Sequence, residues 1–100
     1  MSIKVTNKDF ENIISNNDIT LIDFYADWCG PCKALAPIID DIAKNETHIT
    51  VGKVNVEEER DLAIKYGVRS IPTMVIFKNG KEVNRLVGFL PKEEILSKIK

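Results

Sequence analysis

The sequence predicts an α/β fold with a central mixed β-sheet, because short apolar runs alternate along the chain with segments of helical spacing. The run over residues 19–26 is apolar on both faces, as expected of a strand buried at the centre of a sheet. Asn79-Gly80, the commonest hairpin turn pair, separates two further apolar runs. These runs predict an antiparallel hairpin at the end of a partly parallel sheet.

The first predicted elements are a strand, a helix and the central strand. Residues 3–5 form the short opening strand. Asn7 is expected to cap a helix in which Phe10 and Ile14 share one face. The central strand over residues 19–26 follows.

A long helix is expected next, with an apolar stripe opposite charged residues. The stripe consists of Cys32, Leu35, Ile38, Ile39 and Ile42. Pro37 lies inside this pattern and is expected to kink the helix. After a strand over residues 49–56, glutamates at positions 57–59 favour a new helix start, and Gly67 suits its end.

The remaining elements are the hairpin strands over residues 73–78 and 82–87, and a last helix beginning near Pro91. The predicted order is β-α-β-α-β-α-β-β-α, which gives about five strands flanked by about four helices. We expect residues 1–100 to form a single domain.

Composition and charge exclude several classes of protein. The net charge of −1, with lysines and acids interspersed, gives no basic patch for nucleic acid. No apolar run approaches the roughly 20 residues of a membrane span, and the polar N-terminal segment lacks the apolar core of a secretory signal. We therefore expect a soluble, cytoplasmic monomer with neither a membrane nor a nucleic-acid partner.

The two cysteines of the chain, Cys29 and Cys32, lie between the central strand and the long helix. At the helix start, unpaired backbone N–H groups and the helix dipole favour a thiolate at Cys29. Cys32, one turn further in, is better placed to attack a mixed disulfide than an incoming substrate. The Cys-x-x-Cys pattern in this context predicts redox chemistry.

Two other interpretations of the cysteines remain open. A structural disulfide across so few residues would contribute only about 2 kcal/mol through chain entropy. A closed zinc site needs about four ligands, and His48 is the only histidine, so a dimer would have to complete it. Either alternative would make the chain a binding module rather than an oxidoreductase.

Asp23 is a carboxylate in the otherwise apolar central strand, on the same face as Leu21 and Tyr25. Burial should raise its pKa, which makes Asp23 a candidate acid/base for the proton of Cys32. A carboxylate that makes only a structural hydrogen bond is the alternative. Lys53, on the next strand, is either its partner or a lysine that extends to the surface.

Two segments are distinctive: Asp23-Phe24-Tyr25-Ala26 and Trp28-Cys29-Gly30-Pro31-Cys32-Lys33. Together with the order of elements, they resemble the thioredoxin family over nearly the whole chain, and the Cys-Gly-Pro-Cys form is specific to that family. The resemblance implies a thioredoxin fold and a protein-disulfide reductase. Cys29 would be the nucleophile and Cys32 the resolving cysteine, with a redox-active disulfide between them.

The resemblance also implies roles for residues outside the cysteine motif. Asp23 would be the buried acid/base, with Lys53 as its partner. The Ile71–Pro72 bond is expected to be cis, leaving the backbone of Ile71 free to pair with an extended client, and the proline would keep metal ions from the sulfurs. The residues expected to line the substrate groove are Trp28, Gly30, Pro31, Ile71, Pro72 and Gly88.

No bound cofactor is implied by the resemblance. Electrons would come from NADPH through a flavin-dependent thioredoxin reductase and pass to client proteins, in electron transport and cell redox homeostasis. The alternative function is that of an oxidase or isomerase of the same fold. The Gly30-Pro31 pair between the cysteines argues against this alternative. The chain departs from the family at Tyr25, Asp27 and Ser70, where tryptophan, glutamate and glycine are frequent.

Overall fold

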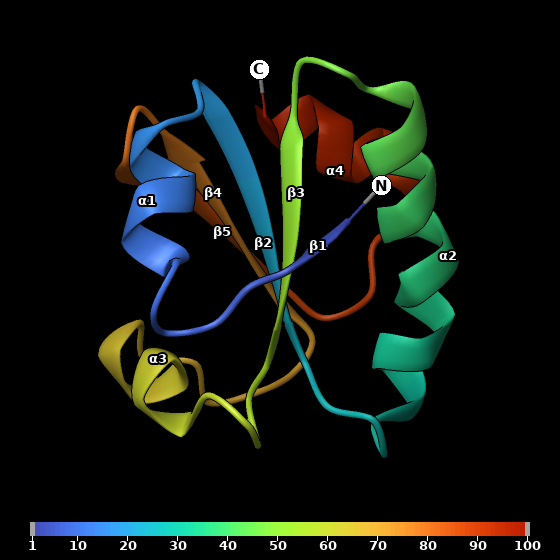
Figure 1. Ribbon diagram of the computed structural model, residues 1–100. Helices are drawn as coiled ribbons and strands as arrows, with labels where there is room; N and C mark the ends of the chain where they lie inside the picture. Colours follow the sequence, from blue (N-terminus) through green and yellow to red (C-terminus); the bar gives the residue numbers. More distant parts are fainter. Residues whose placement is uncertain (1, 100) are drawn as a thin grey trace.

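The computed structural model describes residues 2–99. Its elements follow the predicted order: β1 (Ile3–Lys4), α1 (Phe10–Ser15), β2 (Ile19–Tyr25), α2 (Gly30–Asn45), β3 (Thr50–Asn55), α3 (Arg60–Lys65), β4 (Thr73–Lys78), β5 (Lys81–Val87) and α4 (Lys92–Ile99). The strands form one sheet with the neighbour order β1-β3-β2-β4-β5. Helices α1 and α3 cover one face, and α2 and α4 cover the other (Figure 1). The predicted fold class is confirmed.

Strand β2 is central, as its apolar run predicts. It pairs in parallel with β3 and in antiparallel with β4. Because β4 runs the opposite way, its first residue, Thr73, pairs with Phe24 near the end of β2. The segment that leads into β4 therefore lies at the same edge of the sheet as the loop that follows β2. This edge holds the two cysteines.

Side chains of β2 alternate between two hydrophobic cores. Leu21 packs in the core that contains Ile39 of α2, whereas Ile22 packs in the core that contains Phe10 of α1. Successive side chains of a strand point to opposite faces. Asp23 therefore lies on the α2 side, as the alternation predicts.

Helix α2 carries the cysteine motif and begins with Cys29 as its N-cap. Pro31 occupies the first turn, where the backbone N–H has no partner inside the helix, so proline costs no hydrogen bond there. The helix continues on both sides of Pro37. Among residues 2–99, no helix combines the length and apolar character needed to span a membrane.

The start of α1 differs from the sequence prediction. Asp9, not Asn7, is the N-cap, and the Asp9 carboxylate accepts a hydrogen bond from the backbone N–H of Thr6 at 2.7 Å. The N–H of Asn7 instead donates to Glu59 Oε1 at 2.9 Å. Asparagine and aspartate cap helices about equally well, so residue type does not separate the two positions.

The predicted hairpin is confirmed at Asn79-Gly80, which joins β4 to β5. Both residues have positive φ, 52° and 84°, as a type I′ turn requires. Strand β5 begins at Lys81, one residue earlier than expected, and its register with β4 shifts between Ile76 and Phe77.

Candidate active site

Cys29 and Cys32 form a disulfide at the amino end of α2, with their Cα atoms 5.2 Å apart. The Cys29 Sγ accepts a hydrogen bond from the backbone N–H of Cys32 at 3.2 Å. This N–H belongs to the first turn, whose donors have no partner inside the helix. After reduction, the same donor and the helix dipole stabilise a negative charge on Cys29.

Exposure does not distinguish the two cysteines, because each has 4% of its surface accessible. The two cysteines differ in their position on helix α2. Cys29 is the N-cap, and its Sγ lies 3.8 Å from the carbonyl oxygen of Ile71. The segment before β4 therefore closes one side of the disulfide.

The motif residues around Cys29 form an exposed rim. Trp28, which precedes it, is 67% exposed, and Gly30 and Pro31, which follow it, are exposed as well. Trp28 is thus not part of the hydrophobic core.

The three other residues that the resemblance assigns to the substrate groove, Ile71, Pro72 and Gly88, come from two distant segments. The Ile71–Pro72 bond is cis, which is the geometry that the resemblance implies. The N–H of Gly88 donates to the carbonyl oxygen of Pro72 at 2.8 Å, and Gly88 has a φ of +90° with open space where a Cβ would lie. Among residues 2–99, the N–H of Ile71 has no hydrogen-bond partner. This backbone is available to an extended peptide.

Asp23 is 1% exposed, and its Oδ1 has no hydrogen-bond partner within residues 2–99. Burial is the main influence on this carboxyl and raises its pKa from 3.8 to about 7, as expected. The positive charge of Lys53 lowers the pKa, and the negative charge of Asp40 raises it, both to a smaller extent. The carboxyl is therefore suited to take up and release a proton near neutral pH.

Lys53 lies beside Asp23 in the register of β3 against β2. None of the ion pairs within residues 2–99 joins the two side chains. The ammonium of Lys53 lies over the ring of Tyr25, with Nζ 4.8 Å from the ring centroid. Lys53 acts on Asp23 through its charge, not through a direct contact.

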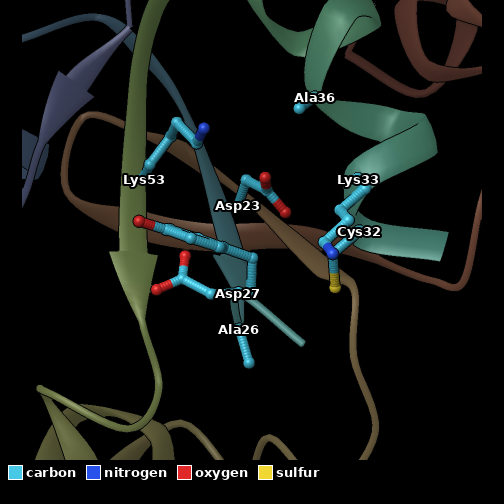
Figure 2. Close-up of a pocket in the computed structure, with 8 residues that line it drawn as sticks. Asp23, Ala26, Asp27, Cys32, Lys33, Ala36 and Lys53 are labelled. Atoms are coloured by element: carbon cyan, nitrogen blue, oxygen red, sulfur yellow. The ribbon is translucent and has the colours of Figure 1, made fainter. Parts of the chain in front are cut away.

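A cavity of about 320 Å³ connects this carboxylate with the cysteine motif. Figure 2 shows the Asp23 side chain between Lys53 on one side and Cys32 on the other. The residues that line the cavity are Asp23, Tyr25, Ala26, Asp27, Cys32, Lys33, Ala36 and Lys53. Asp23 and Cys32 therefore line one continuous space.

Asp23, Cys32 and Lys53, which the sequence predicts as site residues, line one cavity, and Tyr25, which it does not predict as a site residue, lines the same cavity. Tyr25 is two residues from Asp23 on the same strand, so the shared face was the available signal. Within residues 2–99, no group of three His, Cys, Asp or Glu side chains is arranged to hold a metal ion.

A family model described as Thioredoxin matches residues 1–100. The thioredoxin of Mycoplasmoides gallisepticum is 39% identical over 97 residues, which are 96% of this chain and 97% of that protein. The thioredoxin of Chlorobaculum thiosulfatiphilum is 46% identical over 98 residues, 96% of this chain and 91% of that protein.

Solved thioredoxin structures superpose closely on this one. A mutant thioredoxin from Halobacterium salinarum gives a TM-score of 0.93 at 38% identity, covering 98% of this chain and 87% of that one. The oxidised thioredoxin of Plasmodium falciparum gives 0.89 at 34% identity, covering 98% and 97% of the two chains.

Proposed function

This chain belongs to the thioredoxin family, and from that premise we propose how its residues reduce disulfides in other proteins. It is a thiol–disulfide oxidoreductase with a Cys-Gly-Pro-Cys active site. The observation that carries this function is the Cys29–Cys32 disulfide at the amino end of α2.

Cys29 begins the reaction in the reduced protein. Its thiolate attacks one sulfur of the client disulfide, the client S–S bond breaks, and the other client sulfur leaves as a thiolate. A mixed disulfide then joins Cys29 to the client. The position of Cys29 at the N-cap, with the N–H of Cys32 directed at its sulfur, supports this assignment.

Cys32 completes the reaction by attacking the sulfur of Cys29. The Cys29–Cys32 disulfide forms, the second client sulfur leaves, and two electrons have passed to the client. Asp23 accepts the Cys32 proton, directly or through water. The support for this role is the pKa of about 7 and the cavity that Asp23 shares with Cys32. Lys53 is the partner of Asp23, because its nearby positive charge lowers the pKa of the Asp23 carboxyl.

The client binds as an extended segment over the groove residues. Its backbone pairs with the free N–H of Ile71, in a short form of strand addition. Trp28 supplies exposed apolar surface beside Cys29, and the open backbone at Gly88 allows close approach. Gly30, Pro31 and Pro72 complete the groove.

Turnover requires a partner that returns two electrons to the disulfide. Thioredoxin-family proteins normally hold no cofactor of their own. We assign the resupply to a flavin-dependent thioredoxin reductase that draws on NADPH. Residues 1–100 then act as one monomeric domain in the cytoplasm, in electron transport to client proteins and in redox homeostasis.

Insulin reduction, followed by the turbidity of the released chains, tests the two cysteine roles. Cys29→Ser should abolish activity, and Cys32→Ser should stop turnover but accumulate mixed disulfides with the client, visible by mass spectrometry. His48→Ala, in an exposed loop, is the control and should keep full activity.

Activity that survives Cys29→Ser would refute the mechanism, and so would adducts formed through Cys32 in place of Cys29. A reduction potential well above that of the cytosolic glutathione pool would make the chain an oxidant instead of a reductant.

A further inference from the structure

The Lys53 ammonium makes a cation–π contact with the ring of Tyr25, with Nζ 4.8 Å from the ring centroid. Within residues 2–99, this ammonium makes neither an ion pair nor a hydrogen bond. A lysine on a strand usually extends its charge into water. Here a cation–π contact determines where the charge lies.

Strand register brings these side chains together. Asp23 and Tyr25 are two residues apart on β2 and lie on one face. Lys53 pairs with Asp23 across β2 and β3, whereas Tyr25 pairs with Asn55, so Tyr25 and Lys53 are diagonal neighbours. All three of Asp23, Tyr25 and Lys53 line the cavity that reaches Cys32.

A second cavity also borders the Lys53 side chain. Lys53 also lines a neighbouring cavity of about 400 Å³ with Ser2, Asp40 and Lys44, and Asp40 is exposed. The charged side chains that border the two cavities are Asp23, Asp27, Lys33, Asp40, Lys44 and Lys53. Lys53 thus shares one cavity with the buried carboxyl of Asp23 and another with the exposed carboxyl of Asp40, and the position of its ammonium decides how strongly it acts on each.

We propose that Tyr25 is a positioning residue whose ring holds the Lys53 ammonium beside Asp23 and thereby sets how readily Asp23 accepts the proton of Cys32. The catalytic consequence rests on the role of Asp23 in the proposed function. Without the ring, the ammonium moves toward water, which hydrates it strongly, and toward Asp40. Lys53 lowers the pKa of Asp23 from its present place, so its departure raises that pKa.

A titration of the Asp23 side-chain carboxyl by carbon-13 NMR in the oxidised protein tests the proposal without using activity. Tyr25→Leu should raise the midpoint by roughly half a pH unit. Tyr25→Phe keeps an aromatic face and should stay near wild type. Lys53→Met should raise the midpoint at least as far, and Tyr25→Leu added to Lys53→Met should produce no further change.

An unchanged or lowered midpoint in Tyr25→Leu would overturn the proposal. The proposal would also be overturned if Tyr25→Leu raised the Asp23 midpoint by the full amount in a protein that already carries Lys53→Met. The ring would then act by covering Asp23 and not through Lys53.

The pH profile of insulin reduction separates this proposal from the proposed function. If Asp23 is the acid/base, the profile of Tyr25→Leu should move by the same amount as the Asp23 midpoint. Asp23→Asn tests the role of Asp23 itself. A profile that Asp23→Asn leaves unchanged refutes that role, while the NMR titration still decides whether Tyr25 positions Lys53.

Discussion

Asp23 makes the stability of this protein depend on pH, because its carboxyl holds a proton more tightly in the folded chain than in the unfolded one. Its pKa is about 7 in the fold, against an ordinary value of 3.8. Between these two values the folded state binds more protons than the unfolded state. The contribution of Asp23 to stability is therefore present below this window and falls as pH rises, by about 1.4 kcal/mol for each pH unit.

Asp23→Asn should remove this dependence, because asparagine has nearly the same size and carries no charge. We expect the free energy of unfolding at pH 8 to exceed that of wild type by up to about 4 kcal/mol, and the difference to shrink toward pH 4. Urea unfolding across this pH range measures it. Asp18→Asn, at an exposed position, is the control. An Asp23→Asn protein no more stable than wild type at pH 8 would contradict the linkage.

Single residues differ in how much the sequence reveals about them. The burial of Asp23 on the face of Leu21 follows from strand alternation, which is a local rule. The location of the Lys53 ammonium follows from a contact with Tyr25 on another strand. A lysine side chain has four rotatable bonds, so no local rule places its end.

Among the elements, the β4–β5 hairpin was the most predictable, since its turn chemistry lies within two adjacent residues. Gly80 has a φ of +84°, which an L side chain rarely adopts, and Asn79 has a φ of 52°. The start of α1 was less predictable, because Asn7 and Asp9 are both good N-caps and only tertiary contacts separate them.

Gly80→Ala should lower the free energy of unfolding by roughly 1 to 2 kcal/mol, the cost of a left-handed conformation for an L residue. The added Cβ would lie 3.5 Å from Ser15 Oγ, which is an ordinary contact, so the cost is conformational and not steric. Chemical denaturation measures it.

Gly30→Ala is the matched control for this substitution, because a Cβ at Gly30 meets no atom within 4 Å and its φ is not positive. Its stability should equal or exceed that of wild type. Equal stabilities for Gly80→Ala and wild type would show that the turn tolerates the side chain.

At the scale of the whole molecule, one sheet carries both hydrophobic cores. Leu21 and Ile22, adjacent on β2, belong to different cores, so the central strand contributes to both. The order of neighbours in the sheet depends on pairing between distant segments, such as Asp23 with Met74. Apolar patterning and turn chemistry predict the central place of β2 and the β4–β5 hairpin, but they contain no information about the pairing of β2 with β4.

The oxidised and reduced proteins should each unfold in one cooperative transition. Reduction should lower the free energy of unfolding by about 2 kcal/mol, the chain entropy of a very short loop. Amide NMR signals of Ile39 and Ile14, one from each core, should disappear together as urea rises. Loss of one signal at clearly lower urea than the other would contradict a single folding unit.

The reversed direction of β4 has a consequence for the growing chain. Cys29 and Ile71, whose atoms meet at the site, are 42 residues apart in the sequence. A nascent chain that has emerged only as far as α3 already contains both cysteines, but Met74 has not yet paired beside Asp23. Asp23 is then less buried than in the complete fold, so its affinity for a proton lies closer to the ordinary value. During synthesis, the chain therefore contains the cysteine motif before it can form the complete active site. The complete site requires β4 to join the sheet.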